Sequence, residues 1–329
     1  MEMTSLGDLR KVIPQDCFRP CTQTSLYYIA RDVVALAVLA STWTHTILLA
    51  WTAYSFLQGL VCTGIWVLAH ECGHGSLFSS ARMNETFGFI LHSFLMVPYF
   101  SWKYTHRRHH RFTGHATRDV AFVPAMKPAD SDRDMFPPSA PMEESDVPIV
   151  QVVSLMGQQL LGWPLHVLFN VSAGKDSLLR EVSGPSHWLR CSKELGATSI
   201  ILLYLLPYLW VNNWLVAITY LQHNHPSVPH YTDDGWNFIK GALSTIDRDF
   251  GFIGRHFFHL IIDRHVVHHL FPRIPFYKTD TATAAIKSVL GELYHSEDSS
   301  FLGELWYQFR TLKYVENDPH RPGCTRWTL

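Results

Sequence analysis

Three long stretches of the 329-residue chain contain no Lys, Arg, Asp or Glu: Val33–Ala69, Val147–Gly174 and Leu195–Gln222. A membrane-spanning helix needs about 20 predominantly apolar residues, so each stretch is long enough to cross a bilayer. A large water-soluble core would not require three uninterrupted runs of this kind. The pattern therefore predicts an all-α integral membrane protein.

The first stretch is too long for a single crossing. At about 1.5 Å per residue it would reach roughly 55 Å, against about 30 Å of hydrocarbon. The polar patch Ser41–His45 offers a turn, so we expect two antiparallel spans at about 28–42 and 47–69. Two further spans are expected at about 150–170 and 196–221, which gives about four transmembrane helices arranged as two hairpins.

Positive charges mark the expected cytosolic side of this membrane protein. Lysines and arginines crowd residues 103–118 and 248–273, whereas the connection between the first two spans has none. Because positive residues favour the cytoplasmic face, we expect regions 70–146 and 223–329 and both termini to be cytosolic. Interfacial helices and a cytosolic helical cap should complete a single domain over 1–329.

The second pair of spans creates a conflict with the charge pattern. It would place the charged segment 175–193 in the lumen, against the rule for positive residues. Folding 195–222 at Pro207 instead would leave two arms of roughly 20 Å, each too short to cross. We favour the first arrangement, which predicts use of the glycosylation sequon Asn170-Val171-Ser172.

The segment Thr86–Trp102 is also apolar, but too little chain separates His74 from His106 for a crossing and a return. It is expected to form a re-entrant or interfacial helix that ends near Pro98. Aromatic side chains gather at membrane interfaces, so Tyr99, Trp102 and Trp163 are expected to contact the lipid boundary.

Composition adds two constraints and one anomaly. The formal net charge is -1, so nothing favours a polyanionic partner such as nucleic acid. The six cysteines include no Cys-x-x-Cys pair and indicate reduced thiols, not a disulfide framework. The 20 histidines are the anomaly, since many of them concentrate in short motifs.

Three histidine clusters lie beside the predicted spans. The first cluster is His70-Glu71-Cys72-Gly73-His74, the second His106-Arg107-Arg108-His109-His110, and the third His265-Val266-Val267-His268-His269. In the second and third clusters the histidines fall at i, i+3 and i+4, which is one face of a helix. Eight imidazoles suit two divalent transition metals with about four ligands each. Iron is favoured over zinc, because zinc sites close at three or four ligands and have no redox chemistry.

A redox metal pair at the ends of spanning helices would be placed to oxidise a lipid. An acyl chain could enter from the bilayer, and an apolar tunnel would keep reactive oxygen species away from water. The pattern thus favours oxygen chemistry on an unactivated methylene group.

These motifs resemble the membrane fatty acid desaturase family, and within it the microsomal Δ12 (oleate) desaturases of fungi and plants. The resemblance covers about residues 10–317 and is carried by the three clusters together with Leu91–His110, Gly162–Pro164, Pro207–His223, Pro229–Tyr231 and Thr245–Gly254. The family implies a di-iron centre, dioxygen, and electrons from cytochrome b5 through its NADH-dependent reductase. It also implies an endoplasmic-reticulum membrane and an acyl-lipid substrate. The haem-binding sequence His-Pro-Gly-Gly is absent, so cytochrome b5 should be a separate protein.

The resemblance also implies a set of metal ligands. They are the eight histidines of the three clusters, namely His70, His74, His106, His109, His110, His265, His268 and His269. The family adds one histidine between the second and third clusters, for which His223 is the best match and His225 the weaker candidate. Glu71 should orient a ligating imidazole, and Asp247 should either do the same or form a surface ion pair. No covalent nucleophile is expected.

Two departures from the family pattern leave the reaction open. Gly75 stands where relatives usually carry His or Gln, and 195–222 is shortened by about one short helix. Desaturation to a cis double bond, hydroxylation and acetylenation therefore all remain as outcomes. Two other classes fit parts of the chain. His70–His74 matches the His-Glu-x-x-His motif of zinc proteases, but a protease would leave the other two clusters unexplained. Metal transporters place their ligands inside the spans, whereas the clusters of this chain lie just outside the uncharged stretches.

Overall fold

The computed structural model describes residues 5–42, 48–121, 123–127, 147–169 and 201–328. Within these ranges the chain is mostly helical. Three of the described helices are long and apolar enough to cross a membrane: Thr22–Ser41, Ala50–His74 and Ile201–His223. They belong to α2 (Thr22–Ser41), α3 (Leu48–His74) and the continuous pair η2 (Ile201–Leu205, π-helical) and α9 (Leu206–His223).

The helices expected at about 28–42 and 47–69 form, but their ends differ from the expectation. α2 already begins at Thr22, and α3 continues to His74. The first histidine cluster is therefore the last turn of a long apolar helix and does not follow it. Most of the expected turn at Ser41–His45 lies outside the described residues.

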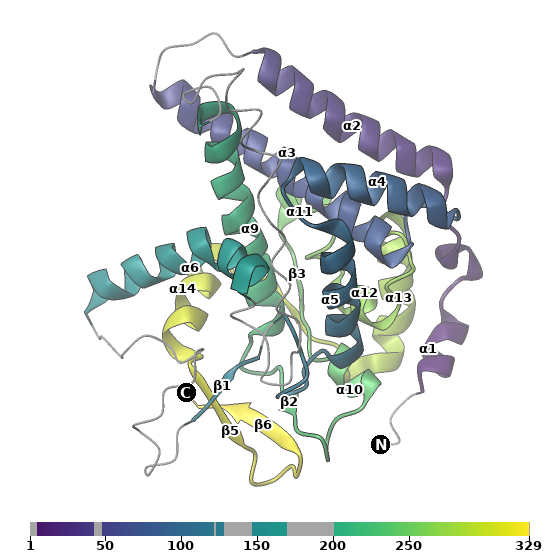
Figure 1. Cartoon of the computed structure of the whole chain (residues 1–329). Helices are drawn as coiled ribbons and strands as arrows, with labels where there is room; N and C mark the ends of the chain where they lie inside the picture. The colour runs from purple at the N-terminus through teal and green to yellow at the C-terminus, as the bar shows by residue number, and fades with distance from the viewer. Residues whose placement is uncertain (1–4, 43–47, 122, 128–146, 170–200, 329) are drawn as a thin grey trace.

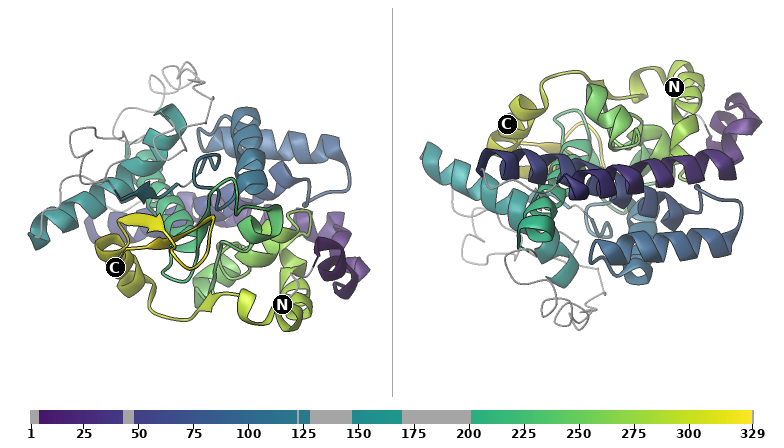
Figure 2. Two further views of the ribbon diagram at one scale, coloured as in Figure 1. Left: turned by 90° about the horizontal axis from the view of Figure 1, so that it is seen from below. Right: turned by 90° about the horizontal axis from the view of Figure 1, so that it is seen from above.

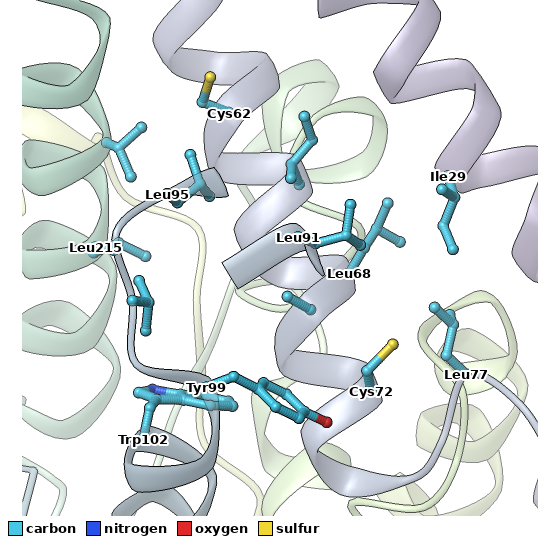
Figure 3. Packing of buried hydrophobic residues seen from close by; sticks show 14 of the residues in the cluster. Ile29, Cys62, Leu68, Cys72, Leu77, Leu91, Leu95, Tyr99, Trp102 and Leu215 are labelled. Carbon is cyan, nitrogen blue, oxygen red and sulfur yellow. The ribbon is translucent and has the colours of Figure 1, made fainter. Parts of the chain in front are cut away.

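Helix α3 is the centre of the helical core. It contacts α2, α4 (Ala81–Phe94), α5 (Tyr99–Phe112) and α9. Figure 3 shows Leu68 of α3 among Leu91 of α4 and Leu215 of α9, all of which are buried. Helix α2 differs, because Val34 and Val38 on its outer face are exposed. Exposed apolar side chains on a spanning helix are suited to contact with lipid.

Helix α6 (Pro148–Phe169) forms where a third span was expected, at about 150–170. Its described part, Pro148–His166, is not among the candidate spans, and Gln151, Gln158 and Gln159 lie within it. It also runs across α9 and not alongside it (Figure 1, Figure 2). The count of four spans therefore stays a prediction.

The apolar segment before the second cluster is divided between two helices. α4 ends at Phe94 and α5 begins at Tyr99, so the chain turns between them at Leu95–Pro98. The hydroxyl of Tyr204 in η2 donates a hydrogen bond of 2.6 Å to the carbonyl of Phe94. The turn between α4 and α5 is thus held against a candidate spanning segment. A re-entrant segment needs such cover, because non-helical backbone within a membrane must be buried against protein.

The expected interfacial position of Tyr99 and Trp102 is wrong. Both side chains are buried, and Figure 3 shows them inside the helical core. The hydroxyl of Tyr99 donates to the carbonyl of Asn84 at 3.3 Å. Trp163 is half-buried and packs against Trp66, with ring centroids 5.7 Å apart. These aromatic side chains line the protein interior.

The expectation of an all-α fold also needs a correction, because two small sheets are present. One has the order β1 (Ala125–Met126), β5 (Tyr314–Asn317), β6 (Cys324–Trp327), β2 (His230–Tyr231). β1 runs parallel to β5, and the other two pairings are antiparallel. The second sheet pairs β3 (Asp247–Arg248) with β4 (Ser296–Glu297) in parallel. The strands join the end of the chain to the segments that follow the second histidine cluster.

Short helices complete the described chain on the side away from the Ser41 end of α2 (Figure 1). They are α1 (Leu6–Val12), α10 (Phe238–Ala242), α11 (Gly251–His256), α12 (His265–Leu270), α13 (Thr279–Leu290) and α14 (Phe301–Thr311), with single 3-10 turns η1 (Gln15–Phe18), η3 (Phe276–Lys278) and η4 (Gly291–Leu293). Leu9 of α1, Val266 and Leu270 of α12, and Ile286 of α13 share one buried apolar cluster. This packing fixes the orientation of α12, which carries the third histidine cluster.

Candidate metal centre

The structure brings all nine candidate histidines together. His70, His74, His106, His110 and His268 form one group and His109, His223 and His269 a second, and within each group the ligand atoms lie within 4.8 Å of one another. His265 joins the second group, with its Nε2 atom 3.3 Å from that of His223 and 3.0 Å from that of His269. The weaker candidate His225 lies outside both groups and contacts Ser227 and Glu297 instead.

The imidazoles present the same nitrogen to one another. The Nε2 atom of His106 lies 2.8 Å from that of His70 and 3.0 Å from that of His74. The Nε2 atoms of His268 and His110 are 3.2 Å apart. Neutral imidazole carries one proton on its two nitrogens, so a set of facing Nε2 lone pairs suits a cation. The donor set thus fits transition-metal ions.

Four helix ends point at this site. α3 ends at His74 and α9 at His223, while the last turns carry His109 and His110 in α5 and His268 and His269 in α12. The C-terminal end of a helix carries a partial negative charge from its unsatisfied carbonyls. The convergence of four such ends favours a bound cation beyond what the imidazoles supply.

Hydrogen bonds on the far side of several rings leave Nε2 free for a metal. The Nδ1–H group of His109 donates to a carboxylate oxygen of Asp119 at 2.7 Å, and that of His265 donates to the carbonyl of Ile261 at 3.0 Å. Thr113 donates its hydroxyl proton to the carbonyl of His109. It therefore accepts from Nδ1 of His269, which lies 3.1 Å away. Such partners orient ligating imidazoles and set their tautomers.

Glu71 lies behind two of the candidate ligand rings. Its Oε1 atom lies 3.5 Å from Nδ1 of His70 and 3.9 Å from Nδ1 of His268. Its Oε2 atom accepts hydrogen bonds from the hydroxyl of Ser76 at 2.8 Å and the backbone N–H of Phe276 at 3.2 Å. A protease general base would have to face the metal-bound water on the Nε2 side. The carboxylate of Glu71 lies on the opposite side of the rings.

Burial keeps the imidazoles outside the spanning helices neutral. Desolvation, followed by repulsion from neighbouring rings, lowers the pKa of His106, His110, His265 and His269 well below its usual value. The same causes lower the pKa of His268 to about 3. Neutral imidazole is the form that binds metals. These rings are therefore in the form that binds metals at neutral pH.

Comparison with known proteins places these features in a family. The family model for fatty acid desaturases matches residues 41–301. A Δ12 fatty acid desaturase of Mortierella isabellina is 38% identical over 354 residues, which cover 95% of this chain and 88% of the relative. A Δ12 desaturase of Arabidopsis thaliana is 38% identical over 346 residues, with the same coverage of both chains. An oleate hydroxylase of Claviceps purpurea is 34% identical over 385 residues, covering 99% and 80%.

The chain belongs to the fatty acid desaturase family. This desaturase-family member is accordingly an oxidoreductase enzyme and a mostly helical membrane protein whose histidine groups can hold metal. The resemblance expected from the sequence is confirmed.

Tryptophans cover the side of the histidine groups that faces the helical core. Trp102 stacks on His106, with ring centroids 4.7 Å apart, and Trp66 stacks on His70 at 5.6 Å. Trp163 of α6 packs edge-on against Trp66. These indole rings shield the imidazoles of His70 and His106 on that side.

Asp247 stabilises the third cluster in a way that the sequence did not indicate. Its Oδ1 atom accepts a hydrogen bond of 2.7 Å from the backbone N–H of Val266, and its Oδ2 atom accepts one from Tyr294. Arg264 precedes α12 and supplies no side-chain cap. Buried Asp247 therefore caps this six-residue helix, so it neither binds an imidazole nor forms a surface ion pair.

Asp119 and Thr113 are the functional candidates that sequence reasoning missed. Asp119 lies outside every motif, and its carboxylate reaches His109 because the chain reverses after α5. A second carboxylate oxygen accepts from the backbone N–H of Gly114 at 3.2 Å. Burial opposes ionisation of Asp119, but attraction to His109 and the hydrogen bonds outweigh it and lower its pKa.

Proposed function

We propose that this protein is an oxygen-dependent acyl-lipid desaturase that introduces a cis double bond, with Δ12 chemistry on an oleate-like chain. The observation that carries the proposal is the convergence of nine imidazoles, with their Nε2 atoms facing, beneath a tryptophan wall. The Mortierella and Arabidopsis relatives, both named Δ12 desaturases, supply the position of the double bond.

Two iron ions are proposed for the two histidine groups. His70, His74, His106, His110 and His268 would hold one ion, and His109, His223, His265 and His269 the other. Bound iron would supply the oxidising chemistry. Dioxygen would accept two hydrogens from the chain together with two electrons and two protons from the donor and the solvent, and it would leave as two water molecules.

The side chains around the groups have separate tasks in this proposal. Asp119 and Thr113 hold ligand rings in one orientation and tautomer, and Glu71 places a carboxylate group behind His70 and His268. Trp66 and Trp102 keep water from the reacting methylene groups. No side chain attacks the substrate, because the hydrogens leave to the oxidant and not to a protein nucleophile.

The partners and the membrane arrangement extend this proposal. The electrons would come from a separate cytochrome b5 and its NADH-dependent reductase, and the substrate chain from a membrane lipid. We propose one multi-pass domain over 1–329 in the endoplasmic-reticulum membrane, with the histidine clusters and both termini cytosolic. Supporting this topology, α1 and β6 both lie on the side away from the Ser41 end of α2 (Figure 1).

A hydroxylase is the second candidate, because the Claviceps relative is named an oleate hydroxylase. Both reactions begin at the same methylene groups and differ in whether a second hydrogen leaves or oxygen is inserted. The histidine groups serve either reaction, so the product decides between them.

Expression in a yeast that makes oleate but no linoleate tests the proposal. We expect gas chromatography of total lipids to reveal a diunsaturated C18 product in cells with the wild-type protein. His268→Ala should abolish it, whereas His225→Ala, a matched histidine outside the groups, should retain it. A hydroxylated chain would establish the second candidate. Equal product from His268→Ala and wild type would overturn the assignment of the site.

A further inference from the structure

One face of α5 changes from apolar to basic along its length. Phe100, Tyr104, Arg107 and Arg111 recur at spacings of three and four residues, which places them on one side of the helix. Phe100 and Tyr104 are 57% and 61% exposed, and both arginines are also exposed. The metal-centre histidines of α5 lie on the opposite side. We call these four residues the α5 stripe.

The apolar end of the α5 stripe continues onto α4. Phe89 and Ile90 of α4 are 50% and 54% exposed. The ring of Phe89 stacks on that of Phe100, with centroids 6.0 Å apart. The turn between the two helices is held by Tyr204 of a spanning segment. Phe94 beside this turn and Leu205 of the candidate span are also exposed, at 40% and 43%, so the exposed apolar surface of α4 and α5 adjoins that of a span.

The basic end gathers several positive charges. The guanidinium carbons of Arg108, Arg111 and Arg118 lie 5.9, 5.4 and 5.9 Å from the centroid of the Phe112 ring. Arg118 is paired with a carboxylate of Asp233 at 2.5 Å. Among the described residues, Arg107 and Arg111 form no ion pair. Like charges gathered in this way repel one another, and a bound anion would offset that repulsion.

The dimensions match a helix that passes from hydrocarbon to headgroups. Arg107 lies about 10 Å beyond Phe100 along the axis, and Arg111 about 16 Å beyond it. The headgroup layer adds roughly 5–8 Å to each side of the hydrocarbon core, so an inclined helix crosses it over this length. Tyr104 stands between the apolar and basic ends, as amphipathic aromatic side chains do at the interface.

We propose that Arg107 and Arg111 bind the phosphate of a phospholipid headgroup in the leaflet that faces the metal centre. Continuity with an apolar surface favours a lipid over an acidic protein, since a protein partner would not require Phe89 and Phe100 to be exposed beside the arginines. The lipid would then lie on the outer side of the helix that carries the second histidine cluster. The proposal needs membrane insertion but no particular oxidation product.

Native mass spectrometry of the purified full chain in detergent tests this site directly. The probes are dioleoylphosphatidylcholine, dioleoylphosphatidylglycerol and dioleoylglycerol, which share acyl chains but differ in the phosphate. We expect the wild-type protein to retain both phospholipids and to release dioleoylglycerol. Each arginine removed should weaken phospholipid retention about fivefold, so Arg107→Gln/Arg111→Gln should lose about 25-fold.

Two further variants make the result specific. Arg10→Gln removes an exposed arginine on α1, which also lies over an aromatic ring, and it should bind phospholipid like the wild type. Arg107→Lys/Arg111→Lys keeps the charges and should recover most of the retention. Equal retention of dioleoylglycerol and phospholipid, or unchanged retention in the glutamine variant, would overturn the proposal. If the glutamine variant kept its lipid but its metal centre were no longer reduced by an acidic electron-transfer protein, the lipid proposal would be wrong. The arginines would then be assigned to that protein partner. None of these measurements requires desaturase activity.

Discussion

The buried contact between Asp119 and His109 gives the sharpest prediction about the metal centre. Asp119→Asn keeps the size of the side chain but replaces one acceptor oxygen by an amide donor. In the structure one carboxylate oxygen accepts from Nδ1–H of His109 at 2.7 Å and the other accepts from Gly114 N–H at 3.2 Å. The oxygen that accepts from His109 also accepts from the backbone N–H of Ala121 at 3.0 Å. An amide oxygen there would keep both contacts but lose the negative charge, so the hydrogen bond that orients His109 is weakened.

The magnitude follows from the loss of a partner behind a ligating imidazole, which typically lowers metal affinity by 10- to 100-fold. This corresponds to about 1.4–2.7 kcal/mol. Asp119→Ala also leaves a buried N–H group without an acceptor, which costs about 1–3 kcal/mol of folding free energy. We therefore expect Asp119→Asn to lose metal with a smaller loss of folding stability than Asp119→Ala, which removes both acceptor oxygens.

The assay is iron content after equilibration of purified protein with graded concentrations of a chelator. Asp233→Asn is a matched control, because Asp233 also contacts a histidine, His115, at 3.2 Å, but that histidine lies outside both metal groups. Asp119→Asn should release iron at 10- to 100-fold lower chelator, while Asp233→Asn should follow the wild type. Identical release curves for all three proteins would refute the role of Asp119.

Three further predictions concern the helices and the topology. Asp247→Ala removes the cap of α12 and should lower stability by about 0.5–2 kcal/mol, measured as earlier thermal unfolding in detergent, with reduced iron retention. Gly64→Ala would place a methyl group 2.5 Å from the carbonyl of Phe257 and should destabilise the protein by about 1–3 kcal/mol, whereas Gly157→Ala, with open space around it, should be tolerated. Glycosylation at Asn170 should occur if that loop is lumenal; an unmodified sequon beside a glycosylated reporter control would contradict the second pair of spans.

The convergence of the candidate histidines was predictable because their signal is local. Spacings of three and four residues identify one face of a helix before any tertiary structure is known, and His106, His109 and His110 all reach the site. The resemblance to known desaturases then selected His223 over His225, and the structure agrees with that choice. What the spacing could not indicate is that each ligand helix ends at the centre, which depends on how the helices pack.

Contacts between distant segments were not predictable in the same way. Asp119 reaches His109 through a chain reversal, and Asp247 caps a helix that begins 18 residues later. Trp102 was expected at the lipid boundary because composition cannot distinguish an interfacial tryptophan from one stacked on a histidine. The two-residue strands were missed because alternation needs a longer run to be visible.

Gly75 illustrates a departure whose physical reason only the structure reveals. Its backbone is left-handed, with φ of 70°, and the N–H groups of Gly75 and Ser76 donate to the carbonyls of Cys72 and Glu71. This is the hydrogen-bond pattern of a Schellman motif, which glycine favours. The residue therefore terminates α3 directly after His74. Because glycine places no side chain beside the metal centre, this position does not distinguish desaturation from hydroxylation or acetylenation.

The most direct test of the metal centre is the metal content of the purified wild-type protein, measured by mass spectrometry together with Mössbauer spectroscopy of iron-57-labelled protein. The account predicts two irons per chain in nitrogen-rich coordination, with loss of iron in His109→Ala and His268→Ala but not in His225→Ala. One zinc per chain, or iron that remains after both cluster substitutions, would contradict it.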